Sequence, residues 1–217
     1  MTYTGKVSEG GPPDVRELAD LVITKLSVRP TDNNAYLLRC RSTGDQLLID
    51  AANEPDRLLE LIGAAGLSTV VTTHRHHDHW FGLVDVVAET GARSIAHAAD
   101  AVELPVVHET VADGDIVGVG TCSLEVIHLV GHTPGSIALL YRDPSGIPHL
   151  FTGDSLFPGG VGATWGNADN FTSLINDVEH KLFDRLPDET WFYPGHGNDS
   201  TLGTERPSIP EWRARGW

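Results

Sequence analysis

The residues with the clearest chemical potential lie in one short segment, residues 73–79, which read THRHHDH. In an extended or turning backbone, side chains two positions apart point to the same side, so His74 and His76 can reach one ion. Asp78 and His79 fall at the start of the helix expected next and could serve a second ion nearby. Imidazole and carboxylate groups are ligands that suit zinc, iron or manganese. The segment therefore predicts a metal site, with a solvated polar turn as the alternative interpretation.

Three later residues extend this prediction. His132 lies in GHTPGS at 131–136, Asp154 in TGDSLF at 152–157, and His196 in PGHG at 194–197. Each follows a predicted strand, and the neighbouring glycines let the backbone pass close to other groups. Loops at strand ends commonly carry functional side chains. Each residue alone is a weak signal, but the three together, after the histidine cluster, favour one shared site.

Strand and helix patterns alternate around these residues. A helix with Pro55 in its first turn is expected after Asn53. Apolar periodicity also predicts helices over 80–90 and 170–183. The strand signals are β-branched or apolar runs bounded by turn residues, at 35–39, 47–50, 68–73, 123–129, 137–141, 150–152 and 190–193. Strands and helices mixed in both halves predict an α/β protein whose sheets are covered by helices.

The motifs at 74–79, 131–136, 152–157 and 193–206 resemble those of the metallo-β-lactamase superfamily, and within it the glyoxalase II group of hydroxyacylglutathione hydrolases. The resemblance spans roughly residues 30–206. It implies a four-layer αββα sandwich. We expect a single domain over 1–217, with 1–15 a loose lead-in and 197–217 a short C-terminal tail.

The resemblance also implies a ligand set for two divalent metal ions, with zinc expected first and iron or manganese as alternatives. His74, His76 and His132 would hold one ion, and Asp78, His79 and His196 would hold the other. Asp154 would bridge both ions. Asp50 would lie beneath the cluster and orient a ligand by a hydrogen bond, or it would be a simple strand-end turn.

Two ions at one site imply hydrolysis of a small acyl substrate, most simply a thioester. Metal binding can lower the pKa of water from 15.7 to about 7, and an ion can polarise the scissile carbonyl. Asp78 is the proposed catalytic proton acceptor, since the family uses that carboxylate so. No nucleophilic side chain is needed, and Cys40 and Cys122 fall in strand patterns typical of small buried apolar residues.

The chain departs from the glyoxalase II pattern in two places. Only 21 residues follow His196, so the helical substrate domain of that group is expected to be absent. The segment PGGVGATW at 158–165 has no basic anchor for glutathione. We expect this segment to form a flexible cleft wall, with Trp165 either an apolar lid or a buried structural residue. His108 lies in a proline-containing segment that could border the cleft, and His77 is expected to be exposed or to support a ligand.

Charge and composition exclude other classes. The chain has 15 Lys+Arg against 30 Asp+Glu, a net charge of −15, which disfavours nucleic acid and anionic membranes as partners. Two cysteines cannot form a disulfide framework, and no apolar stretch of 18 residues occurs. A cytoplasmic location is therefore expected, and the oligomeric state is left open.

Several functions remain possible beside thioester hydrolysis. Persulfide dioxygenases resemble this family but use one iron, and the presence of Asp78, His79 and His196 favours two metals instead. Lactonases share all seven ligands and stay open. True β-lactamases usually lack the bridging aspartate, which here is Asp154, and the acidic charge disfavours the nucleases. A metal-binding scaffold without activity is the alternative outside enzymes.

Overall fold

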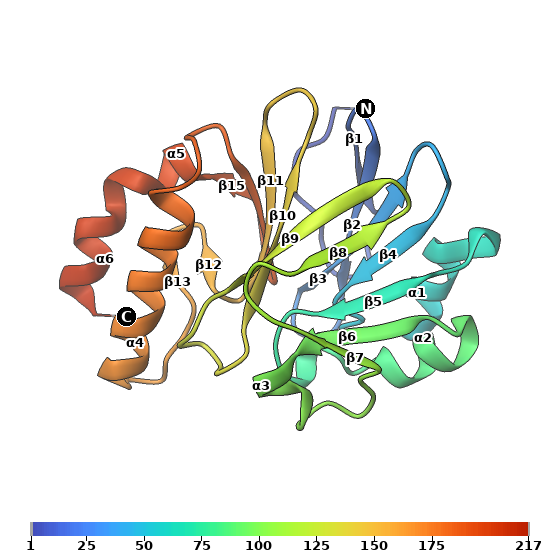
Figure 1. Cartoon of the computed structure of the whole chain (residues 1–217), viewed down its shortest axis with the longest axis horizontal. Helices are drawn as coiled ribbons and strands as arrows, with labels where there is room; N and C mark the ends of the chain where they lie inside the picture. Colours follow the sequence, from blue (N-terminus) through green and yellow to red (C-terminus); the bar gives the residue numbers. More distant parts are fainter. Residues whose placement is uncertain (1, 217) are drawn as a thin grey trace.

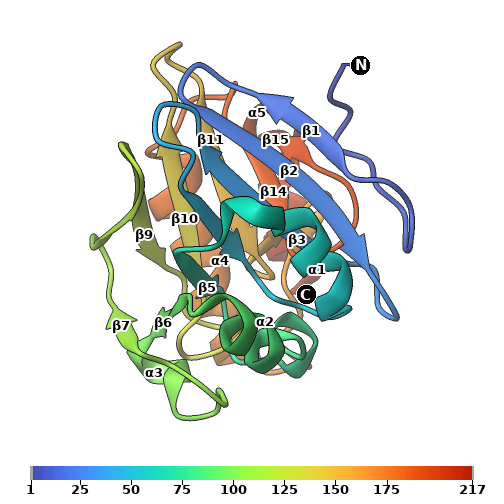
Figure 2. The same ribbon diagram turned by 90° about the vertical axis from the view of Figure 1, so that its right-hand side faces the viewer.

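Most strands of this protein are apolar on both faces. In the strand Asn33–Cys40, Tyr36 and Leu38 belong to one buried cluster, whereas Ala35 and Leu37 belong to another. A sheet with two apolar faces must be covered on both sides. The computed structural model, which describes residues 2–216, meets this need with two sheets packed face to face and helices on each outer face (Figures 1 and 2). The predicted αββα sandwich is confirmed.

The first sheet has seven strands, and they lie side by side in chain order. They are β1 (Asp14–Glu17), β2 (Leu21–Val28), β3 (Asn33–Cys40), β4 (Gln46–Ile49), β5 (Thr69–Thr72), β6 (Arg93–His97) and β7 (Glu109–Val111). Pairing is antiparallel from β1 to β4 and parallel from β4 to β7.

The second sheet has six strands in the order β15-β14-β11-β10-β9-β8. They are β8 (Ile116–Val119), β9 (Cys122–His128), β10 (Ile137–Arg142), β11 (Pro148–Gly153), β14 (Trp191–Pro194) and β15 (Ser200–Thr201). A short hairpin is formed by β12 (Leu156–Phe157) and β13 (Gly160–Val161). β10 is antiparallel to both β9 and β11, and β14 is parallel to β11. Strands β9, β11 and β14 therefore run in the same direction, and their C-terminal ends lie on the same side of the sheet.

Helices α1 (Pro55–Ile62) and α2 (Leu83–Thr90) cover the outer face of the first sheet (Figure 2). Helices α4 (Ala168–Asp177), α5 (Leu202–Glu205) and α6 (Ile209–Arg215) cover the second (Figure 1). The short α3 (Ala98–Ala101) follows β6, and a π-helix over Val178–Phe183 continues α4. Single helical turns lie at Gly63–Ala65, His77–His79 and Arg206–Ser208.

The predicted elements differ from the observed ones mainly at their ends. The helix expected over 80–90 begins at Leu83, because the segment before it forms the separate turn His77–His79. The helix expected over 170–183 changes to a π-helix at Val178. The sequence patterns missed strands β1, β2, β6, β7 and β8 and the two-residue strands β12, β13 and β15.

Both ends of the chain carry more structure than a lead-in and a tail. Lys25, buried in β2, donates to the carbonyl oxygens of Gly5 and Gly197 and pairs with Asp199 at 2.6 Å. Strand β1 begins at Asp14, within the expected lead-in, and residues 197–216 include β15, α5 and α6. This buried ammonium group joins the two ends of the chain.

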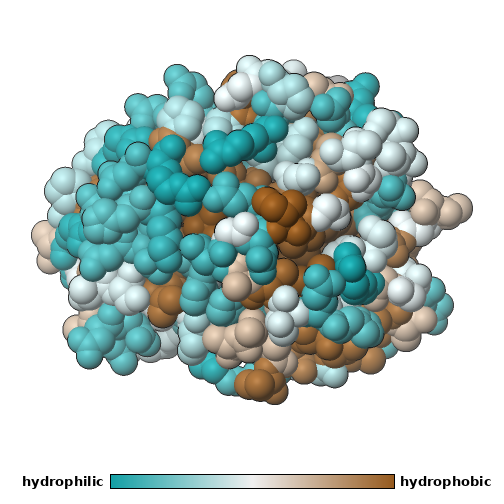
Figure 3. Space-filling view, in the orientation of Figure 1, coloured by the Kyte–Doolittle hydropathy of each residue, from teal (hydrophilic) through white to brown (hydrophobic). Residues whose placement is uncertain are grey.

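The surface shown in Figure 3 is hydrophilic over the helices of the second sheet, while apolar residues gather near its centre and its lower right. Among residues 2–216, no helix is long and apolar enough to cross a membrane.

Candidate metal centre

The histidine-rich segment is anchored from below by Asp50. This buried residue follows β4 in a left-handed conformation, with φ +58°. Its carboxylate accepts from the backbone N–H of Thr73 at 2.7 Å and from the Thr73 hydroxyl at 2.8 Å, and it lies 2.8 Å from His79 Nδ1. Asp50 therefore fixes the start of the segment and one imidazole, which is more than a strand-end turn requires.

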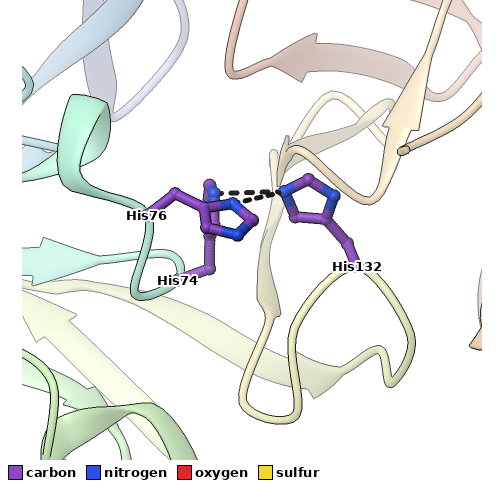
Figure 4. A group of neighbouring side chains, drawn as sticks. All are labelled: His74, His76 and His132. Carbon is purple, nitrogen blue, oxygen red and sulfur yellow. Dashed lines mark hydrogen bonds between the residues drawn. The ribbon is translucent and has the colours of Figure 1, made fainter. Parts of the chain in front are cut away.

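His74, His76 and His132 form the first group of potential ligands. His74 and His76 follow β5 in the first sheet, whereas His132 lies in the loop between β9 and β10 of the second (Figure 4). His132 Nε2 is 3.3 Å from His74 Nε2 and 2.9 Å from His76 Nδ1. The three ring nitrogens converge on one point between the two sheets, as the i, i+2 spacing predicted for the first two.

Asp78, His79 and His196 form the second group. His196 Nε2 lies 3.2 Å from His79 Nε2 and 3.3 Å from Asp78 Oδ2. Asp78 and His79 share the helical turn that follows His76, and the His79 ring also lies 4.1 Å from that of His74, centroid to centroid. His196 follows β14 and reaches the group from the other sheet.

Asp154, just after β11, lies between the two groups. Its Oδ2 is 3.6 Å from His132 Nε2 and 3.5 Å from His196 Nε2, and its Oδ1 is 3.3 Å from His79 Nε2. Oδ1 is nevertheless buried without a hydrogen-bond partner. A buried carboxylate oxygen is costly to leave unpaired, so this atom is suited to binding a cation.

Gly195 makes room for that carboxylate. A Cβ atom at this position would overlap Asp154 Oδ1 and would come within 2.6 Å of His79 Cε1. The glycine before His196 is therefore required by a close approach, as its place at a strand end suggested.

The spacing of these donor atoms fits a metal ion. An ion with bonds of about 2.0–2.1 Å in tetrahedral geometry places its ligand atoms about 3.3–3.4 Å apart. The closest distances between ligand atoms of different residues are 2.9 to 3.7 Å, and the ligand atoms of each group all lie within 4.8 Å of one another. All seven predicted ligands fall into groups that could hold an ion, namely His74 with His76 and His132, His74 with His79 and Asp154, and Asp78 with His79 and His196.

The candidate ligands differ in how their surroundings shift their pKa values. Burial lowers the pKa of His74, and it lowers the pKa of His132 to about 4, which keeps both rings in the neutral form that binds metal. At His196, hydrogen bonds with Asp154 and Asp78 outweigh burial and raise the pKa to about 9. Hydrogen bonding to His196 also lowers the pKa of Asp78, so this carboxylate is ionised at neutral pH.

Asp100 is a functional candidate that the sequence patterns missed. This fully buried carboxylate in α3 accepts from Arg75 N at 3.0 Å, Thr133 Oγ1 at 2.5 Å and Gly135 N at 2.8 Å. It therefore ties the loop of His74 and His76 to the loop of His132. No local motif marks Asp100, because its partners are 25 to 35 residues away.

Asn33 was missed for the same reason. Its amide donates to Asp78 Oδ2 at 3.0 Å and lies 3.3 Å from His196 Nε2. It comes from the start of β3, 45 residues before Asp78. Asn33 therefore supports the second group from an element with no metal-ligand signal of its own.

The structure also shows where His77, His108 and Trp165 lie. His77 is exposed and stacks edge-on with Trp80, as expected for a residue that is not a ligand. His108 accepts from Ser94 N at 3.0 Å and lines no cleft beside the two groups. Trp165 is 68% exposed, so the buried structural role is wrong, and it lies against the rings of His76 and His132. Cys40 and Cys122 are buried free thiols, as predicted.

Two facing sheets with helices outside, and histidine and aspartate donors gathered at one edge between them, define a metal-binding protein of the αββα class. A family model described as the metallo-beta-lactamase superfamily matches residues 28–196. The chain belongs to this superfamily.

Curated relatives agree with the glyoxalase II resemblance. The chain is 38% identical over 167 residues to a hydroxyacylglutathione hydrolase of Polaromonas sp., covering 76% of this chain and 62% of the relative. It is 33% identical over 172 residues to a probable hydroxyacylglutathione hydrolase of Schizosaccharomyces pombe, covering 76% of this chain and 64% of that one. The chain thus spans about three fifths of the length of these relatives.

Solved structures support the same fold. The chain matches ETHE1 from Myxococcus xanthus with a TM-score of 0.75 and 29% identity, covering 88% of this chain and 84% of that one. It matches TTHA1623, solved in a di-iron-bound form, with a TM-score of 0.72 and 29% identity, covering 86% of this chain and 98% of that one.

Proposed function

We propose that this protein is a dinuclear metal-dependent hydrolase of a small acyl substrate, most simply a thioester. The observation that carries the proposal is the position of Asp154. Its carboxylate lies within 3.6 Å of His132 in the first group and within 3.5 Å of His79 and His196 in the second, while Oδ1 has no hydrogen-bond partner. A single carboxylate between two ligand groups suits a bridge between two ions. The hydroxyacylglutathione hydrolases among the relatives support the choice of a thioester.

In this proposal His74, His76 and His132 hold one ion, Asp78, His79 and His196 hold the other, and Asp154 contacts both. When bound at these residues, two such ions would supply a hydroxide at neutral pH and would stabilise negative charge on the substrate oxygen. Asp78 is the one candidate ligand carboxylate with substantial exposure, 39% of its side chain, and its lowered pKa keeps it ionised, as a proton acceptor must be. Asn33 holds Asp78 in place for that role.

Zinc is the first choice of metal, because three imidazoles in one group and mixed imidazole and carboxylate donors in the other are common zinc ligands. Iron and manganese accept the same donors. We also propose a cytoplasmic location, which the two free buried thiols and the absence of a disulfide among the described residues support.

The two alternative enzyme functions differ in whether they require the second group of ligands. A mononuclear iron dioxygenase holds its one iron with two histidines and one aspartate and does not use the second group. Here Asp78, His79 and His196 are arranged with ligand atoms 3.2–3.7 Å apart. A lactonase would use both groups and differs from a thioesterase only in its substrate.

The test combines metal analysis with a substrate panel. Purified protein loaded with zinc, iron or manganese is assayed on S-acetyl thioesters, γ-lactones and glutathione persulfide. Thioester hydrolysis by the two-metal form supports the proposal. Oxygen uptake on persulfide by a form with one iron, without thioester hydrolysis, would replace it with the dioxygenase.

A further inference from the structure

The metal centre opens on one side into a pocket of about 270 Å³. Arg75, Val130, Pro134, Trp165 and Asn170 line it together with two of the candidate ligands, His76 and His132. The pocket adjoins His76 and His132, so it is positioned to receive one arm of a substrate whose carbonyl lies at the ions. The groups that line the pocket therefore select the chemistry of that arm.

Trp165 is the largest apolar group of the pocket. Its ring centroid lies 5.2 Å from that of His76, edge-on, and 5.3 Å from that of His132. Yet 68% of the residue is exposed, so packing in the core does not account for its place. An exposed indole beside two ligand imidazoles offers a broad face to a planar partner.

The backbone at Trp165 is held in an unfavourable conformation. Its φ is +50°, a left-handed value that bulky side chains rarely adopt. Strain of this kind persists where surrounding structure enforces it, and it is concentrated at ligand-binding sites. The left-handed backbone costs free energy and leaves the indole exposed to water. A bound ligand that covers the indole would explain why this conformation is kept.

The pocket offers no free cation to an anionic arm. Among its described lining residues Arg75 alone carries a permanent positive charge, and its guanidinium is paired with Glu103 and lies 4.0 Å from Asp100. The remaining lining is apolar or neutral, from Val130, Pro134 and the Asn170 amide. A neutral, flat group satisfies this lining better than a carboxylate does.

We infer that the pocket selects substrates with a neutral aromatic ring in one arm, which packs against Trp165. This inference rests on the proposed function and names its substrate class. The inference covers a ring in the acyl arm and a ring in the thiol arm, since either arm can extend from a carbonyl held at the ions. Aromatic contact of this kind corresponds to a preference of about 3- to 10-fold in kcat/KM.

Three thioesters test the inference with the zinc-loaded protein. S-acetyl-N-acetylcysteamine has no ring, S-phenylacetyl-N-acetylcysteamine has a ring in the acyl arm, and S-benzyl thioacetate has one in the thiol arm. Wild type should prefer one of the ring-bearing substrates about 3- to 10-fold. Trp165→Ala should abolish this preference with the bound metal unchanged, and Trp165→Phe should keep most of it.

Phe81→Ala is the matched control, because this exposed phenylalanine contacts His77 rather than a candidate ligand. It should leave the preference intact. An equal loss of kcat/KM on all three substrates in Trp165→Ala, or no preference in wild type, would overturn the inference.

A binding measurement separates this inference from the proposed reaction. Phenylacetate should quench the indole fluorescence of the zinc-loaded wild type more than acetate does, and the difference should vanish in Trp165→Phe. Stronger quenching by phenylacetate without hydrolysis of any thioester would refute the proposed reaction and support the inferred aromatic binding at Trp165. Hydrolysis with equal quenching by both carboxylates would refute the pocket and keep the reaction.

Discussion

Replacing Asp100 by asparagine tests whether a carboxylate outside the ligand set positions the first metal group. Both oxygens of Asp100 are used, Oδ1 by Gly135 N and Oδ2 by Arg75 N and Thr133 Oγ1. An amide NH2 in either orientation would face a backbone N–H donor. The substitution therefore keeps the shape of the side chain but must break a contact to at least one of the two ligand loops.

The magnitude follows from these contacts. A hydrogen bond to a charged group contributes about 1.5–3 kcal/mol, and a buried donor left unpaired costs about 1–3 kcal/mol. We therefore expect Asp100→Asn to lose roughly 2–3 kcal/mol of folding free energy. Loss of a group that orients metal ligands typically costs about 10- to 100-fold in metal affinity. The loss should fall on the site of His74, His76 and His132, because Asn33 supports the other group independently.

Cobalt titration with a competing chelator measures the two sites separately. Asp143→Asn is the matched control, since Asp143 is a buried carboxylate that accepts from Ala19 N and Ser145 N in a turn apart from both ligand groups. The control should lose stability with both cobalt affinities unchanged. If Asp100→Asn behaves like the control, Asp100 serves the fold alone and the reasoning is refuted.

Three further predictions follow from the same structure. Asp154→Ala should bind fewer than two ions and lose thioesterase activity, as elemental analysis and assay will measure; unchanged metal content would contradict the bridging role. Gly195→Ala should lower metal content similarly, because the new Cβ would occupy the place of the Asp154 carboxylate, and a variant with two ions and normal activity would refute that overlap. Burial, with Arg16 nearby, lowers the pKa of His149 to about 4 in the folded protein. As the pH is lowered, His149 therefore takes up a proton in the unfolded chain before it does so in the folded protein. The free energy of unfolding should fall between about pH 6.5 and 4, by up to about 3 kcal/mol. Denaturant unfolding of metal-free His149→Gln should show a shallower fall than wild type, and identical pH profiles would contradict the assignment.

The candidate ligand residues could be predicted because each is marked locally. Four lie in one heptapeptide, and His132, Asp154 and His196 each follow a strand and a glycine. Parallel courses of β9, β11 and β14 bring these last three to one edge. The αββα fold came from the resemblance, since a continuous apolar run shows that a strand is buried on both faces without showing which strand is its neighbour.

The supporting residues were not predictable in the same way. Asp100 and Asn33 act through partners far along the chain, so neither has a neighbouring motif that distinguishes it from an ordinary polar residue. Strand β2 was missed although it is almost wholly buried, because Lys25 interrupts its apolar pattern. Strand β1 was missed because its four residues alternate between half-buried and exposed and include three charged side chains. The buried lysine pairs with Asp199, near the other end of the chain, and donates to the carbonyl oxygens of Gly5 and Gly197.

The central claim is that two ions are held by one bridged set of ligands. The most direct test is the metal content per chain of purified protein loaded with zinc, measured by elemental analysis on wild type and on Asp154→Ala. The account predicts close to two ions in wild type and a clear loss in the variant. One ion per chain in wild type, with the same content in Asp154→Ala, would contradict it.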